Sequence, residues 1–246
     1  MLVFYQANRK KLSKSKNILG VILARGNSKG IKKKNLLKLN GRTLIDIAID
    51  NALKSKRLNK IVFSSEDDSL INIAKKKIKV HFKRPKNLST DTSSSYSVIK
   101  HAIKWLEKND SWNSEIVVIL SPTTPFRTAK HIDAVLDLMT KKNYDAAMTI
   151  TDPDYPPYWM FKKENNRYKF ILPKGKNITR RQDAPKVYQP AGMVYAMKTN
   201  FLNKLKGILP QGKTGGYFVK REVAMNIDTL TQFETAKFLA KKYLKK

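Results

Sequence analysis

The sequence has 246 residues, of which 41% are hydrophobic, and it carries a formal net charge of +31. It contains no cysteine, which excludes disulfides, zinc–thiolate sites and cysteine nucleophiles, and no apolar run is long enough for a transmembrane helix. The length suits one large α/β domain with a sizeable buried core.

Basic residues are in large excess, with 50 lysines and arginines against 19 acidic residues. Such a charge is compatible with a nucleic-acid-binding module, because cations neutralise phosphates. Lysines make up most of this set, however, and they are spread along the whole chain instead of forming one stripe with aromatic residues between them. This pattern favours a solvated basic surface that attracts small anions over a dedicated nucleic-acid partner.

Residues 1–16 are predicted to form a basic N-terminal extension. They begin with a short apolar stretch and continue with basic residues, which reverses the order found in a signal peptide. Nothing there argues for export, so we expect a cytoplasmic protein that does not associate with membranes. The remaining residues, 17–246, are expected to form one domain.

Apolar runs and helical periodicities alternate along the domain, as in proteins built from β-α-β units. The predicted strands are 18–24, 61–64, 80–82, 116–120, 145–151, 193–197 and 222–227. The predicted helices are 44–54, 67–77, 92–108, 129–141, one beginning at Thr199, and 230–244. This order predicts a three-layer α/β/α fold of Rossmann-like type, with a mostly parallel sheet between two layers of helices.

Residues 152–190 interrupt this alternation with many prolines and aromatic residues. Tyr155, Tyr158, Trp159, Met160 and Phe161 are too apolar for a free loop. The segment is therefore predicted to leave the core, either as an oligomerisation arm or as a lid.

A basic loop follows the first predicted strand, where an open parallel sheet presents its ligand crevice. Arg25, Lys29 and Lys34 can neutralise phosphates, and Gly26 and Gly30 allow the backbone to approach them. The spacing matches neither the Walker loop nor G-x-G-x-x-G. Taken alone, the loop is equally compatible with a solvated turn in a lysine-rich protein.

The loop Ala24-Arg25-Gly26-Asn27-Ser28-Lys29-Gly30, followed by Lys34-Asn35, resembles the nucleotide-binding signature of the acylneuraminate cytidylyltransferases. The resemblance continues in order through most of residues 18–240. Its further motifs are Phe63-Ser64-Ser65-Glu66-Asp67, Lys83-Arg84-Pro85, Leu88-Ser89-Thr90-Asp91-Thr92, Ser121-Pro122-Thr123-Thr124-Pro125-Phe126-Arg127, Arg181-Gln182-Asp183-Ala184-Pro185 and Ile227-Asp228-Thr229.

The resemblance implies an enzyme that transfers CMP from CTP to the anomeric hydroxyl of an acidic nine-carbon sugar and releases pyrophosphate. It also implies the nucleotide-diphospho-sugar transferase type of fold, a magnesium cofactor, and a homodimer in which the 152–190 arm reaches the partner's sugar site. Catalysis would consist of positioning and charge neutralisation, with no nucleophilic side chain. No general base is identified.

Residue roles are implied by the same motifs. The catalytic group would be Arg25, Lys34 and Asp228. The nucleotide would contact Arg25, Gly26, Lys29, Lys34, Asn35, Arg84 and Ser95. The sugar would contact Ser121, Thr123, Arg127, Arg181, Gln182 and Tyr195, and the metal would be held by Asp228 and Asn226.

Several of these residues also have purely structural interpretations. Arg84 could be a surface loop residue, Thr123 a helix cap, Tyr195 a core residue of a strand, and Asp228 a cap for the last helix. His81, His101 and His131 match no motif and are interpreted as structural.

The sequence departs from the sialic-acid pattern at three places. Ser121 stands where that pattern has glutamine, Ala191 where it has asparagine, and Asn226 where it has the first aspartate of Asp-Ile-Asp. The first two changes shorten polar side chains expected to face the sugar. Together with the run 180–188, which is more similar to the legionaminate-type branch, they favour a modified or deoxy sugar. A catalytically degenerate relative acting as an assembly partner would also explain the departures.

Overall fold

The computed structural model describes residues 16–28, 30–205, 208–209 and 212–244. Its centre is a six-stranded sheet in the order β10-β6-β9-β5-β1-β4. The strands are β1 (Ile18–Leu23), β4 (Lys60–Ser64), β5 (Ile116–Leu120), β6 (Ala146–Thr151), β9 (Gln189–Lys198) and β10 (Thr214–Phe218). Only β9 runs antiparallel to its neighbours among these described strands. The predicted mostly parallel sheet is confirmed.

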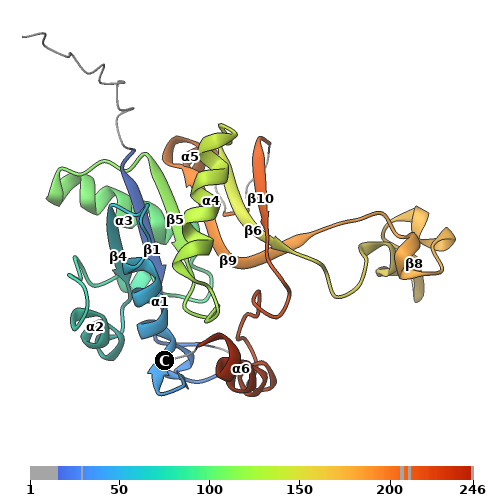
Figure 1. Ribbon diagram of the computed structural model, residues 1–246, viewed down its shortest axis with the longest axis horizontal. Coiled ribbons are helices and arrows are strands. Elements are labelled where there is room, and N and C mark those ends of the chain that lie inside the picture. The colour runs from blue at the N-terminus through green and yellow to red at the C-terminus, as the bar shows by residue number, and fades with distance from the viewer. Residues whose placement is uncertain (1–15, 29, 206–207, 210–211, 245–246) are drawn as a thin grey trace, which may run out of the picture.

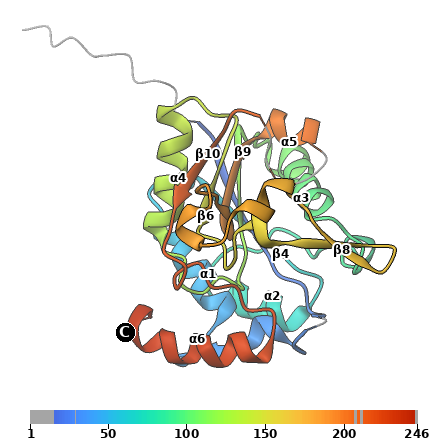
Figure 2. The same ribbon diagram turned by 90° about the vertical axis from the view of Figure 1, so that its right-hand side faces the viewer.

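Helices cover both faces of the sheet (Figures 1 and 2). Helices α1 (Leu44–Leu53), α2 (Asp68–Lys75) and α4 (Ala129–Lys141) pack on one face, and α3 (Ser95–Asp110) and α5 (Thr199–Leu205) pack on the other. Side chains of β1 point alternately to the two faces of the sheet, and each face has its own hydrophobic core. Ile18 and Ile22 belong to the first core, under α1, α2 and α4, whereas Leu19 and Val21 belong to the second core, under α3 and α5. The three-layer arrangement follows from this pattern.

A third, smaller core forms under helix α6 (Leu230–Tyr243), which lies at the lower end of the molecule in Figures 1 and 2. Ala236 and Ala240 of α6 are buried there with Ile31, Ile47 and Ile227. The short hairpin of β2 (Lys38–Leu39) and β3 (Arg42–Thr43) precedes α1 and contributes Leu39 to this core. This core joins the loop after β1 to the C-terminal segment.

Residues 152–188 leave the sheet between β6 and β9 and extend far from the body of the molecule (Figure 1). They carry the hairpin of β7 (Phe161–Glu164) and β8 (Arg167–Phe170). Tyr155 is 70% exposed and Tyr168 is 71% exposed. The segment therefore stands away from this chain's own body and is not a lid folded over it.

Two predicted strands are wrong. Residues 80–82 are irregular and pair with no described strand. Val80 packs against the first core and Phe82 packs against the second, so the segment follows the packing of its side chains. Residues 222–227 form a turn followed by irregular chain, since the amides of Val223 and Ala224 donate to the carbonyl of Lys220.

The sixth strand is instead β10, which the sequence pattern missed. Its Gly215 and Gly216 are poor strand formers. Packing requires them, because a Cβ at Gly215 would lie 2.5 Å from the Tyr144 ring and one at Gly216 would lie 2.6 Å from Ile150.

Several boundaries also shift. Helix α3 begins at Ser95 instead of Thr92, and β9 begins at Gln189 instead of Met193. The predicted extension 1–16 lies outside the described residues except for Lys16. No helix in the described part of the chain is long and apolar enough to cross a membrane.

Candidate active site

A cavity of about 760 Å³ opens at the carboxyl ends of β1 and β5. Loops from both halves of the chain and one side of β9 form its wall. It is lined by Leu23, Arg25, Ser28, Gly30, Lys34, Asn35, Arg84, Leu88, Ser89, Thr90, Asp91, Ser93, Ser95, Val98, Ile119, Ser121, Thr123, Gly192, Tyr195, Ile208, Asn226 and Asp228. Ten residues predicted from the motifs are therefore brought together: Arg25, Lys34, Asn35, Arg84, Ser95, Ser121, Thr123, Tyr195, Asn226 and Asp228.

The loop after β1 is held from both sides. The buried Asn35 donates from Nδ2 to the carbonyl of Arg25 at 2.8 Å, which ties the end of the loop to its beginning. Gly26 donates its amide to Glu66 Oε1 at 2.7 Å. Gly30 approaches the C-terminal segment so closely that a Cβ would lie 2.2 Å from the carbonyl oxygen of Asp228. The glycines are needed for close approach within the protein. Lys29 lies outside the described residues.

Arg25 and Lys34, two cations of the cavity wall, each have a carboxylate partner. Arg25 Nη1 lies 2.8 Å from Asp91 Oδ1, and Lys34 Nζ lies 2.7 Å from Asp228 Oδ1. An anionic ligand must therefore compete with carboxylates for these cations. Lys34 is the more buried of the two, with a side chain that is 13% exposed.

Arg84 is a buried residue of the cavity wall, which corrects its interpretation as a surface loop residue. Its Nε donates to Ser64 Oγ at 3.0 Å, and its Nη2 donates to the Ser64 carbonyl oxygen. Burial lowers the pKa of Arg84, the charge of Glu66 opposes that shift, and the charge of Arg25 adds to it. The guanidinium is thus fixed by two bonds at the end of β4.

The wall after β5 is formed by hydroxyl groups. Ser121 Oγ and Thr123 Oγ1 are 2.7 Å apart, and the Thr123 carbonyl accepts from the amide of Ile227 at 2.9 Å. Thr123 is not a helix cap, because the N-cap of α4 is Thr128. Tyr195 is partly buried on β9, and burial raises the pKa of its phenol. It therefore both packs against the second core and faces the cavity.

Three predicted sugar-site residues lie off the cavity wall. Arg127 is only 1% exposed, and its Nη1 donates to the carbonyls of Ser121 and Met193 and to Thr124 Oγ1. Burial lowers its pKa to about 9, so it stays charged at neutral pH. Arg181 and Gln182 are exposed on the arm between β8 and β9. Gly26 also does not line the cavity, although Arg25 and Ser28 do.

Comparisons with known proteins decide the family. Residues 19–244 match the family described as cytidylyltransferase. The chain belongs to the cytidylyltransferase family.

Relatives of this cytidylyltransferase agree with that assignment. It is 30% identical over 224 residues to the CMP-N,N'-diacetyllegionaminic acid synthase of Campylobacter jejuni, covering 90% of this chain and 94% of that protein. It is 29% identical over 224 residues to the pseudaminic acid cytidylyltransferase of Campylobacter jejuni, covering 91% of this chain and 96% of that protein. The enzyme is therefore a nucleotidyltransferase.

The fold matches solved cytidylyltransferase structures as well. A structure of CMP:2-keto-3-deoxy-manno-octonic acid synthetase complexed with CTP superimposes with a TM-score of 0.68 at 14% identity, covering 92% of this chain and 99% of that one. At this identity the match shows the fold alone. It agrees with the predicted nucleotide-diphospho-sugar transferase type.

The implied magnesium ion would find few donors in this cytidylyltransferase. Asp228 Oδ1 faces Lys34, and Asp228 Oδ2 accepts from Asn226 Nδ2 at 2.5 Å. No group of three or more His, Cys, Asp or Glu residues in the described part of the chain could hold a metal. One carboxylate and one amide fit a magnesium ion only if the substrate's phosphates supply further oxygens, which is the usual mode for this metal. Asp228 does not cap α6, because Thr229 does.

Asp91 and Glu66 contribute to the site, but sequence reasoning gave them no role. Asp91 pairs with Arg25, and Glu66 accepts from Gly26 and faces Arg84. Both stand inside motifs that carry the family resemblance, which was a usable signal. Their partners are far away in sequence, and only the fold reveals them.

Proposed function

We propose that the enzyme transfers CMP from CTP to the anomeric hydroxyl of a nonulosonic acid, giving a CMP-sugar and pyrophosphate. The observation that carries this proposal is the cavity at the carboxyl ends of β1 and β5, in which three cations face a hydroxyl-rich wall. The names of the two relatives support a nine-carbon acidic sugar as acceptor.

In the proposed reaction the anomeric oxygen forms a bond to the α-phosphorus while the bond to the pyrophosphate oxygen breaks. The hydroxyl proton leaves the sugar, and no general base is assigned. Arg25 and Lys34 bind the triphosphate in place of their present carboxylate partners. Asn35, Arg84 and Ser95 position the cytidine, so that the reacting atoms are held together.

Asp228 and Asn226 would hold the magnesium ion. Bound there, the ion would supply positive charge against the charge that develops on the leaving pyrophosphate. Asn226 gives one negative charge fewer than an aspartate would, so the affinity depends more on the CTP phosphates. We expect Asn226→Asp to lower the magnesium concentration needed for half-maximal activity and Asp228→Ala to nearly eliminate turnover. Calorimetric titration of magnesium into the CTP complex gives a second readout of the same change.

A deoxy or otherwise modified sugar is the proposed acceptor. Ser121 is short and is already bonded to Thr123, which leaves few long polar groups on this wall. Legionaminate-type and pseudaminate-type acids carry fewer hydroxyl groups than N-acetylneuraminate, so their kcat/KM should be higher. Equal or better use of N-acetylneuraminate would contradict the choice of sugar class.

A homodimer is proposed to complete the sugar site. The arm 152–190 exposes Tyr155, Tyr168, Phe161 and Ile171, which suits burial against a second copy. In a dimer of this kind, Arg181 and Gln182 would reach the partner's sugar. Arg guanidinium suits the sugar carboxylate through paired hydrogen bonds.

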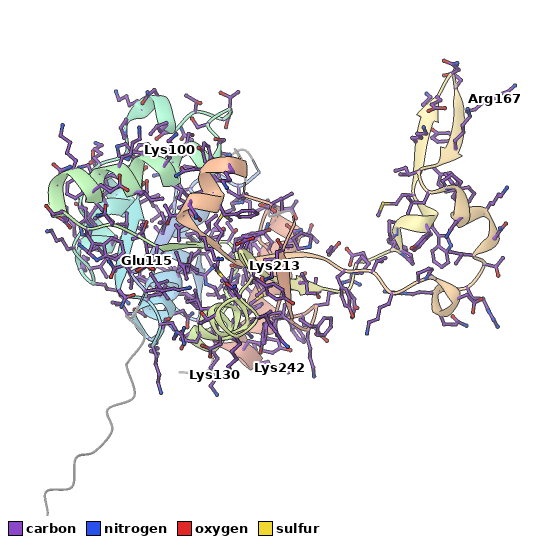
Figure 3. All side chains as sticks on the ribbon, turned by 90° about the horizontal axis from the view of Figure 1, so that it is seen from above. Lys100, Glu115, Lys130, Arg167, Lys213 and Lys242 are labelled. Carbon is purple, nitrogen blue, oxygen red and sulfur yellow. The ribbon has the colours of Figure 1, made fainter. Side chains whose placement is uncertain are left out.

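The deciding experiment measures pyrophosphate release from CTP and magnesium with a panel of nonulosonic acids. Release that needs both CTP and a nine-carbon acid supports the proposal, and Arg25→Ala should abolish it without unfolding the protein. No release with any acid would favour the catalytically degenerate relative. A nucleic-acid role has less support, because basic residues such as Lys100, Lys130 and Arg167 lie on different parts of the molecule instead of forming one stripe (Figure 3).

A further inference from the structure

Glu66 lies between the two halves of the proposed nucleotide site. It follows β4 and precedes α2, and its side chain is 19% exposed. Its Oε1 accepts from the amide of Gly26 at 2.7 Å, in the loop after β1. Its Oε2 is buried without a hydrogen-bond partner and lies 3.9 Å from Nη1 of Arg84. One carboxylate therefore faces both the phosphate loop and the base pocket.

The geometry of Arg84 makes this contact specific. Nε and Nη2 are both bonded to Ser64, so Nη1 is the guanidinium nitrogen left to face Glu66 and a ligand. The separation of 3.9 Å is too long for a hydrogen bond, and the attraction is Coulombic. Arg25 carries a like charge nearby and disfavours the charged form of Arg84, whereas Glu66 favours it.

Stabilisation of the turn before α2 does not account for Glu66. The N-cap of α2 is Asp67, whose Oδ1 accepts from the amide of Leu70 at 3.0 Å. The Asp67 amide is in turn bonded to Ser65 Oγ. The turn between β4 and α2 is therefore stabilised without the Glu66 side chain.

We propose that Glu66 is a positioning residue that couples the phosphate loop to the cytidine pocket. Its Oε1 holds the loop through Gly26, which requires only a hydrogen-bond acceptor. Its Oε2 orients the free nitrogen of Arg84, which requires the negative charge. This inference rests on the proposed function.

Two variants separate the two contacts. Glu66→Gln can keep its single carbonyl oxygen as the acceptor for Gly26, which places the amide nitrogen opposite Arg84. Glu66→Ala removes both contacts. Asp68→Asn is the matched control, because Asp68 is a neighbouring acid whose side chain is 72% exposed and, within the described part of the chain, forms an ion pair only with Lys83.

Binding of CMP reports the cytidine side, and binding of inorganic pyrophosphate reports the phosphate side, both by calorimetry. We expect Glu66→Gln to weaken CMP binding about tenfold while pyrophosphate binding stays within about twofold of the wild type. Glu66→Ala should weaken both by about tenfold. In steady state, KM for CTP should rise in both variants more than kcat falls, and Asp68→Asn should change neither.

The electrostatic field of the protein alone predicts the opposite change in ligand affinity. Removing a negative charge near an anion site should tighten CMP and pyrophosphate binding. Tighter or unchanged CMP binding in Glu66→Gln would therefore overturn the inference. A second combination of results would also overturn the inference. In it, Glu66→Ala loses thermal stability, but Glu66→Gln binds CMP and pyrophosphate as the wild type does.

If Glu66→Ala does not fold, Glu66→Gln still tests the charge-dependent contact. The proposed function fails separately: a wild-type protein that binds neither CMP nor pyrophosphate overturns that function and this inference together. A wild type that binds both, with variants that do the same, overturns the role of Glu66 alone.

Discussion

Arg127 offers a test between two roles, because its motif implies sugar binding whereas the structure buries it. Its Nη1 donates at 2.7 Å to the Ser121 carbonyl, at 3.0 Å to Thr124 Oγ1 and at 3.1 Å to the Met193 carbonyl. These bonds tie the segment after β5 to β9, the strand that carries Tyr195. The buried guanidinium therefore supports the wall of the cavity from behind.

Replacing Arg127 by Ala would leave three acceptors without their donor and open a cavity in the interior. A buried polar group left unpaired costs about 1–3 kcal/mol, and truncation of a large buried side chain costs about 2–5 kcal/mol. Because Ser121 O also accepts from Thr124 Oγ1, the acceptors are not all stranded. We expect a loss of about 3–5 kcal/mol in the free energy of unfolding. Arg127→Met fills most of the volume and should lose about 1–2 kcal/mol.

Urea denaturation followed by circular dichroism measures both values by linear extrapolation. Arg57→Ala is the control, since its partly exposed pair with Asp137 should contribute less than about 1 kcal/mol. In folded Arg127→Met, KM for the sugar should stay within about twofold of the wild type, because the side chain does not line the cavity. Wild-type stability in Arg127→Ala, together with a large rise in sugar KM, would refute the buried role.

Three further predictions test other parts of the molecule. Gly30→Ala should reduce turnover strongly, because the added Cβ would displace the exposed loop from the Asp228 carbonyl. The urea midpoint of unfolding should change little. Unchanged kinetics would contradict this prediction. Burial, reinforced by Arg127, lowers the pKa of His131 below its ordinary 6.5, so the unfolded chain binds the proton more readily and stability should fall as pH drops through that value. His131→Asn should make urea midpoints less sensitive to pH in that window. Light scattering at micromolar concentration should give a dimer, and Tyr168→Asp should shift it toward monomer; a monomeric wild type would count against the arm.

Local sequence signals recovered most of the sheet. The run Ile18–Leu23 is apolar and partly β-branched, and it forms the central strand β1. Thr43, Asp67 and Ser94 precede apolar periodic stretches, and each accepts a capping bond at the start of its helix. These features depend on neighbours in sequence, which explains why they are predictable.

The errors arise where packing overrides local preference. Gly215 and Gly216 are unfavourable in strands, yet they form β10 because Tyr144 and Ile150 occupy the space of their side chains. Arg127 is an exception to the rule that charged residues are rarely buried: its Nη1 donates to two backbone carbonyls, whereas its Nε has no hydrogen-bond partner among the described residues. Neither the β10 strand nor the burial of Arg127 can be predicted from the few residues around it in the sequence.

The site itself was predictable only through the ordered motifs. Arg25 and Asp91 are 66 positions apart, and Lys34 and Asp228 are 194 positions apart, so no spacing rule pairs them. The motifs identified ten residues of the cavity wall. The fold was needed to show that each cation is already paired with an acid.

This pairing changes how the basic composition bears on function. Arg25 faces Asp91, Lys34 faces Asp228 and Arg84 faces Glu66, so the cavity is close to charge balance within a strongly basic chain. Attraction of an anionic ligand to the protein and its retention in the cavity are therefore separate effects. The surface lysines should raise the encounter rate in a salt-dependent way, whereas the proposed binding mode requires exchange of carboxylate partners for phosphates. High salt should consequently slow association more than it weakens the bound complex, because exposed charges are screened more strongly than the partly buried pairs of the cavity wall.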